Sequence, residues 1–218
     1  MTATAAGNTV NYNGAAQTLK ATTYDNLTLS GTGAKTFPSG TTTVNNVLSI
    51  ENGTNTNTFT GTLAYGTAAT LQYNAGSSNR TVAAEWPATF SGSGGVIVKG
   101  TETITLNGAK TLSANVPLTI NSGTLASGNY NLTLGGNFTN NATFTYETST
   151  VTFNGTSPQT ISGTSATTFY NLTINNTGTS GNNSVVLQKP TTVTNALTLT
   201  SGLVNSTVTN VLSVTNTA

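Results

Sequence analysis

Five carboxylates are the chain's only acidic side chains: Asp25, Glu51, Glu85, Glu102 and Glu147. Glycoside hydrolysis needs a pair of such groups facing a sugar, but no Asp-x-Asp or Glu-x-Glu spacing places two of them together on a strand. The chain has no histidine, which removes the general base of a serine-type triad. We therefore expect a protein that is not an enzyme, with isolated carboxylates at strand edges and turns. A polysaccharide-degrading β-helix enzyme stays a distant alternative, which a groove combining Glu with Lys or Arg would favour.

Metal and cofactor sites have no better support. Calcium-binding β-rolls repeat Asp-rich turns, whereas this chain has one Asp, and it has no cysteine for a thiolate site. The glycine-rich segment 91–95, SGSGG, lacks the Lys-Ser/Thr ending of a phosphate-binding loop. We expect neither a metal nor a cofactor.

Two features could bind a ligand passively. Thr101, Thr103 and Thr105 fall on one face of an expected strand, and flat threonine arrays on β-solenoids can order water and bind ice. Such an array requires Thr-x-Thr at the same place on successive coils, whereas the commonest unit here is aliphatic-Thr-aliphatic. Trp86, beside Pro87, is the best candidate for an exposed residue that stacks on a glycan, with a cap over a local insertion as its alternative.

The low charge content and the short apolar runs argue against nucleic acid and against a membrane-spanning helix. Charged residues make up 5% of 218 residues and the net charge is +1, against roughly a quarter charged in most soluble chains. The six basic residues are scattered, so the chain lacks the basic patch that binds nucleic acid. No apolar run is long enough for a membrane-spanning helix. The remaining partners are a surface glycan or receptor, or further copies of the chain.

Short alternating segments predict an all-β fold. In each of them two aliphatic or aromatic residues flank a threonine, so the outer pair faces one side of a strand and the threonine the other. Asn-Gly, Ser-Gly and Gly-Thr-Gly pieces between them supply turns. Examples are the triplets at 27–29, 104–106, 118–120, 132–134, 151–153, 172–174 and 197–199.

The chain also repeats itself. An alternating strand ends in an aromatic residue and an asparagine and is followed by a short polar loop, at 9–19, 70–82 and 150–161. The six repeated positions, which we expect to be structural, are Tyr12, Asn13, Tyr73, Asn74, Phe153 and Asn154. Together with LSIENG, LTINSG and LTLTSG at 48–53, 118–123 and 197–202, they indicate about three degenerate modules of roughly 70–80 residues.

Two architectures fit these repeats. A parallel β-solenoid, right-handed as parallel crossovers usually are, stacks inward aliphatics coil upon coil. Tandem β-sandwich domains are the alternative. We favour the solenoid because the strands are very short and no polar or Pro-rich joint separates the modules. We expect one continuous repeat domain over 1–218, with approximate modules 1–66, 67–147 and 148–218.

The segments TTFYNLTI at 167–174 and TTVTNALTLTSGLV at 191–204 resemble the repetitive β-helical regions of large secreted bacterial surface proteins, and are similar in style to the shafts of filamentous adhesins. The resemblance implies display at the cell surface and a structural or adhesive role. The first ten residues lack the features of a signal peptide, and neither end suggests a cap. We therefore expect a piece of a longer shaft, or a subunit that stacks end to end into a fibre.

Overall fold

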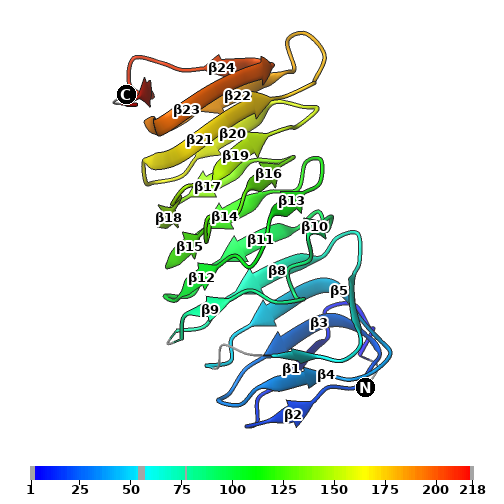
Figure 1. The fold of residues 1–218 in the computed structure, drawn as a ribbon. Coiled ribbons are helices and arrows are strands. Elements are labelled where there is room, and N and C mark those ends of the chain that lie inside the picture. Colours follow the sequence, from blue (N-terminus) through cyan, green and yellow to red (C-terminus); the bar gives the residue numbers. More distant parts are fainter. Residues whose placement is uncertain (1–2, 54–56, 77, 217–218) are drawn as a thin grey trace.

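The computed structural model describes residues 3–53, 57–76 and 78–216 as a parallel β-solenoid of about ten turns, with no helix among them. Figure 1 shows the strands stacked one above another along a single axis. Paired residues of successive coils are about 20 positions apart, as for Leu118 and Phe138. The predicted solenoid is confirmed. Tandem sandwiches are wrong, because sandwiches are built from antiparallel strands and every described pairing, from β1–β3 to β23–β25, is parallel.

Four sheets form the faces of the coil. The long sheet contains, in spatial order, β1 (Thr9–Tyr12), β3 (Thr23–Leu29), β5 (Thr41–Ile50), β8 (Thr70–Tyr73), β11 (Gly95–Val98), β14 (Leu118–Ile120), β17 (Phe138–Asn140), β20 (Gln159–Ser162), β22 (Ser184–Leu187) and β24 (Leu203–Asn205), and β7 (Thr62–Tyr65) also pairs with β5. The second sheet contains β10 (Thr89–Phe90), β13 (Lys110–Leu112), β16 (Leu132–Leu134), β19 (Thr150–Phe153), β21 (Thr167–Asn175), β23 (Thr191–Ser201) and β25 (Leu212–Val214).

The two smaller sheets cover further parts of the coil. The four-stranded sheet contains β9 (Arg80–Thr81), β12 (Thr103–Thr105), β15 (Thr124–Ala126) and β18 (Thr143–Thr145). The three-stranded sheet contains β2 (Gln17–Thr18), β4 (Lys35–Phe37) and β6 (Thr58–Phe59).

Inward side chains form columns along the axis. One column of the long sheet is fully buried and runs through Leu48, Leu71, Val96, Leu118, Phe138 and Ile161. Because a parallel register places equivalent residues over one another, each aliphatic side chain packs against the coils above and below it. The period-2 alternation that was visible in the sequence is therefore the origin of the core.

Outward polar side chains form ladders of their own. On the second sheet, the backbone amide of Thr150 donates to Asn131 Oδ1 (2.9 Å), Asn171 Nδ2 donates to Thr150 Oγ1 (3.2 Å), and Asn195 Nδ2 donates to Asn171 Oδ1 (2.7 Å). Each bond joins one coil to the next. Such ladders stabilise a surface that has few charges.

The corners of the coil need close backbone contact. Gly163 has a φ of 121°, and a Cβ there would lie 2.1 Å from the carbonyl oxygen of Asn140. At another corner the buried Gln159 accepts from the Gly155 amide and donates to the carbonyls of Leu134 and Gly136. Glycine and buried amide side chains therefore make the turns between faces possible.

The repeated aromatic positions are only partly equivalent. Tyr12 and Tyr73 belong to one column of the long sheet, joined through Leu29 and Ile50, whereas Phe153 lies in the second sheet. Tyr73 and Phe153 are fully buried and Tyr12 is half-buried. The expectation of one shared place is therefore wrong for Phe153, because every face uses the same alternating strand followed by a turn.

The asparagines that follow these aromatic residues lie just beyond the strands. Asn13 and Asn154 are exposed, while Asn74 is half-buried. Asn74 Nδ2 donates to Glu51 Oε1 of the preceding coil (3.3 Å), and the backbone amide of Asn154 donates to the Leu134 carbonyl. These contacts lie at the start of a turn.

Candidate functional site

Charged side chains gather inside the coil between β8 and β13. Arg80, Glu85, Glu102 and Lys110 are each at most 5% exposed. The expectation that the carboxylates are isolated on the surface is therefore wrong for Glu85 and Glu102. Strand alternation did not reveal this, because Glu85 belongs to a loop, 82–88, and Glu102 to the bend before β12.

Each charged group in this internal cluster has polar partners. Glu85 Oε1 accepts from the Tyr73 hydroxyl (3.2 Å) and the Ala83 amide (3.0 Å), and Glu102 Oε1 accepts from the Ala75 amide (3.0 Å). Arg80 donates to the carbonyl of Asn52 (2.7 Å). Among the described residues, the second carboxylate oxygen of each glutamate has no hydrogen-bond partner.

Burial dominates the ionisation of this cluster. It raises the pKa of Glu102 above 4.5 despite the nearby Arg80, and it lowers the pKa of Arg80 and of Lys110. Burial and the Glu85 carboxylate together raise the pKa of Tyr73. Perturbed groups of this kind mark functional sites when they line a cleft. Here they lie in the packed interior, so their contacts connect coils to one another.

A third buried cation, Lys35, explains a repeated motif. Lys35 is fully buried, and its ammonium donates to the carbonyls of Gly14 (2.8 Å), Ala15 (2.8 Å) and Gly33 (2.9 Å). Lys110 donates likewise to the carbonyl of Trp86 (2.5 Å). Both lysines belong to a GAKT segment, at 33–36 and 108–111. The repeat was a signal from which these buried lysines could have been predicted.

Trp86 does not offer its ring to a ligand. The side chain is fully buried and its ring lies 6.2 Å from that of Tyr73. The proposed glycan-stacking role at an exposed Trp86 is therefore wrong. The loop that carries it folds inward, where Tyr65 donates to the Glu85 carbonyl beside it (2.5 Å).

The threonines at 101–105 differ in their placement. Thr103 and Thr105 lie on the outer face of β12, but Thr101 lies before the strand and donates to the carbonyl of Gly76 (2.9 Å). The expectation of three threonines on one strand face is therefore wrong for Thr101. Strand pairing places Thr103 beside Thr124, and Thr124 beside Thr143. A second column runs through Thr81, Thr105, Ala126 and Thr145.

These seven residues form what we call the threonine grid. Thr81, Thr143 and Thr145 are exposed, and Thr103, Thr105 and Thr124 are half-buried. Beneath them Ile104, Leu125 and Phe144 point into the core. Thr-x-Thr occurs in β12 and in β18, whereas β15 between them carries Ala126 and β9 contributes Thr81 alone. The grid therefore meets only in part the condition set by the sequence, Thr-x-Thr at one place on successive coils.

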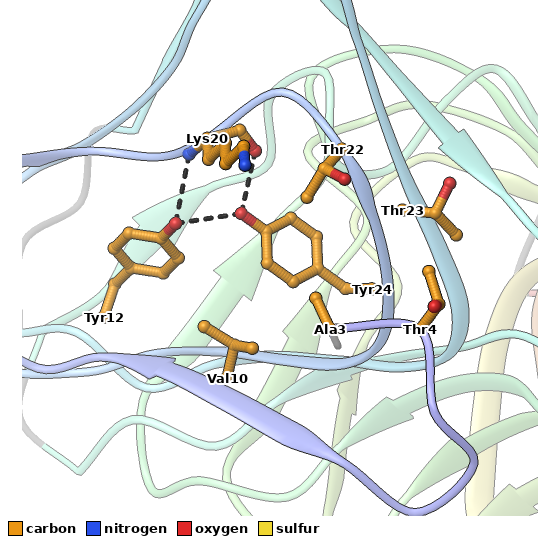
Figure 2. Close-up of a pocket in the computed structure, with 8 residues that line it drawn as sticks. All are labelled: Ala3, Thr4, Val10, Tyr12, Lys20, Thr22, Thr23 and Tyr24. Atoms are coloured by element: carbon orange, nitrogen blue, oxygen red, sulfur yellow. Dashed lines mark hydrogen bonds between the residues drawn. The ribbon is translucent and has the colours of Figure 1, made fainter. Parts of the chain in front are cut away.

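A cavity of about 340 Å³ opens at the end of the coil near β1. Ala3, Val10, Tyr12 and Tyr24 line its apolar part, and Thr4, Lys20, Thr22 and Thr23 complete the wall (Figure 2). The Lys20 amide donates to the Tyr12 hydroxyl (3.0 Å) and the Tyr24 hydroxyl donates to the Lys20 carbonyl (2.8 Å). The Tyr12 hydroxyl must then donate to that of Tyr24, 2.9 Å away. Both tyrosine hydroxyls are therefore engaged in a closed cycle of hydrogen bonds with the Lys20 backbone.

The described residues contain no group of three or more metal-ligating side chains. The same part of the chain has no helix that is long and apolar enough to span a membrane. Comparison of the chain with family models, with curated proteins and with solved structures found no match.

Proposed function

We propose that the chain is a non-catalytic structural element of an extracellular surface protein, a stiff shaft that carries adhesive segments away from a cell. The observation that supports this most directly is the unbroken stack of parallel coils from β1 to β24. In a solenoid each coil contacts only its neighbours, so the stack continues in one direction without forming a globule.

The burial of the charged side chains supports the same role. The Arg80, Glu85, Glu102 and Lys110 side chains are buried in coil-to-coil contacts, so they are inaccessible to a substrate. The outer faces instead carry threonine and asparagine ladders. A surface of this kind suits a spacer whose stability is insensitive to salt, because little of that stability comes from exposed charges.

Distance measurements between the two ends test the shaft. Cysteines can replace the exposed Lys20 and Asn205 for dye labelling, since the chain has no cysteine of its own. About ten turns at about 4.8 Å per turn predict a rod roughly 50 Å long. We expect single-molecule energy transfer to report one narrow distance near that length, unchanged between low and high salt.

Deleting residues 118–137 provides the matched variant, because it removes one turn between the register partners Leu118 and Phe138. The distance should then fall by about 5 Å, one strand spacing. A broad, salt-dependent distribution would contradict the shaft. Release of reducing sugars from a polysaccharide by the purified chain would contradict a non-catalytic role and favour the β-helix enzyme.

A second candidate function, ice binding, is favoured by the threonine grid. Its strands lie about 4.7–4.9 Å apart, and alternate residues along a strand are about 6.6 Å apart. β-Branched threonine has a restricted χ1, so the hydroxyls and methyls form a fixed two-dimensional pattern that can match oxygen positions on an ice face. Arg80 and Glu102, which border the grid in sequence, point inward.

The experiment for the grid compares two lysine substitutions. Thr124→Lys places a hydrated charge in the grid, whereas Thr133→Lys makes the same change on the second sheet, where Thr133 is equally half-buried. We expect the unmodified chain and Thr133→Lys to be retained in slowly grown ice, and Thr124→Lys to lose retention several-fold. Ala126→Thr completes the second column and should increase retention. Equal retention of both lysine variants, or none by the unmodified chain, would contradict ice binding.

A further inference from the structure

Four Asn-Gly pairs occur in the chain, at 13–14, 52–53, 107–108 and 154–155. Asparagine is a chemically labile residue, and it is most labile before glycine, because glycine has no side chain to shield its amide nitrogen. That nitrogen can attack the side-chain carbonyl carbon of the asparagine. In a folded chain the attack requires an amide nitrogen without a hydrogen-bond acceptor and an asparagine side chain that can turn toward it. The four pairs differ in these two properties.

Two of the pairs are held by a glutamine at a corner of the coil. The Gly14 amide donates to Gln17 Oε1 (2.7 Å), and the Gly155 amide donates to Gln159 Oε1 (2.8 Å). The asparagine of each pair is exposed. Exposure alone would therefore make both asparagines reactive, but the glutamine oxygen fixes the amide that would have to attack.

The pair at 52–53 is protected in two ways. The Gly53 amide donates to the carbonyl of Gly31 in the preceding coil (3.1 Å). The Asn52 side chain is fully buried, and its Nδ2 donates to Asn57 Oδ1 (3.0 Å). Neither the nitrogen nor the amide side chain is therefore available for the reaction.

The pair at 107–108 lies in the turn between β12 and β13 and lacks both kinds of protection. Asn107 is exposed, and among the described residues neither its side chain nor the Gly108 amide has a hydrogen-bond partner. A Cβ at Gly108 would meet no atom within 4 Å. The turn is held only at its ends, where the buried Leu106 and Lys110 donate their backbone amides to the next coil.

We propose that Asn107 is a site of spontaneous deamidation in the folded chain. The Gly108 nitrogen bonds to Asn107 Cγ and loses its proton to hydroxide, while the side-chain amide nitrogen takes a proton from water and leaves as ammonia. Water then opens the resulting five-membered imide at either carbonyl, giving aspartate or isoaspartate. The net charge of the chain falls from +1 to 0. The open turn accommodates the altered backbone, so the modification accumulates with the age of the folded protein, whatever role the coil has.

Peptide mapping by mass spectrometry during incubation of the folded chain at mildly alkaline pH tests the proposal. Isoaspartate is detected by methylation with an isoaspartyl methyltransferase. We expect Asn107 to be converted at least several-fold faster than the other three asparagines, and faster as the pH rises. In guanidinium chloride, where the folded contacts are lost, the four rates should converge. Equal rates in the folded chain, or an Asn107 that reacts only in denaturant, would overturn the proposal.

Two glycine-turn variants separate the chemistry from the fold. Gly108→Ala fits the open space, since the φ of Gly108 lies outside the left-handed region, and it should slow conversion of Asn107 at least several-fold with an unchanged circular dichroism spectrum. Gln17→Ala removes the acceptor of the Gly14 amide and should accelerate conversion of Asn13 without affecting Asn107. Gln17→Glu keeps an acceptor oxygen and should leave Asn13 protected. An Asn13 that stays unreactive in Gln17→Ala would refute the role given to these hydrogen bonds.

Discussion

Replacing Lys35 with methionine is expected to lower the free energy of unfolding by about 3 kcal/mol, since hydrogen bonds to a charged group contribute about 1.5–3 kcal/mol each. Methionine keeps most of the apolar stem but leaves the carbonyls of Gly14, Ala15 and Gly33 without the donor that now contacts all three. Removing a buried charge offsets part of the loss, because burial already lowers the pKa of this ammonium. Denaturant unfolding followed by circular dichroism measures the change.

Substitutions of two other lysines serve as comparisons for Lys35→Met. Lys20 is exposed, so Lys20→Met should change stability by less than about 0.5 kcal/mol. Lys110 donates to a single carbonyl, that of Trp86, and Lys110→Met should therefore cost less than Lys35→Met. A Lys35→Met chain as stable as the unmodified one would show that the three carbonyls do not depend on the ammonium.

Phe169→Ala is expected to destabilise the coil by about 4 kcal/mol, the usual range for truncating a buried phenylalanine. The Phe169 ring is fully buried and lies 6.0, 5.8 and 6.4 Å from the rings of Phe138, Phe144 and Phe153. These partners come from three different strands, β17, β18 and β19. One truncation therefore leaves a cavity where three faces of the coil meet.

The effect should also be local. Coils contact only their neighbours, so hydrogen exchange should accelerate in β17 to β22 while β3 and β5 keep their protection. Tyr130→Ala removes an exposed aromatic side chain and is expected to change neither stability nor exchange. Uniform acceleration over the whole chain would contradict independent coils and indicate a single cooperative unit.

The fold could be predicted because alternation along a strand specifies which side chains face inward. The triplets at 118–120 and 132–134 are both found as strands with their outer residues buried and their threonine outward. The same local rule does not say which face of the coil a strand occupies. This is why Phe153 was grouped with Tyr12 and Tyr73 although it belongs to the second sheet.

The interior cluster could not be predicted in the same way. Glu85 and Trp86 lie in a loop, where no periodicity specifies a direction, and composition alone favours placing a carboxylate outside. The extent of the threonine grid beyond Thr103 and Thr105 was missed for a different reason. Its rows come from strands whose pairing depends on the length of each turn, and the sequence pattern does not give those lengths with single-residue accuracy.

The return of the chain to the same column after about 20 residues has an evolutionary consequence. Duplicating or losing one complete circuit changes the length of the coil and leaves its thickness as it was. A gene encoding such a chain can therefore adjust how far its product extends by unequal recombination between similar segments. Each intermediate remains foldable, because no residue needs to adapt to a new environment beyond the two circuits that become neighbours.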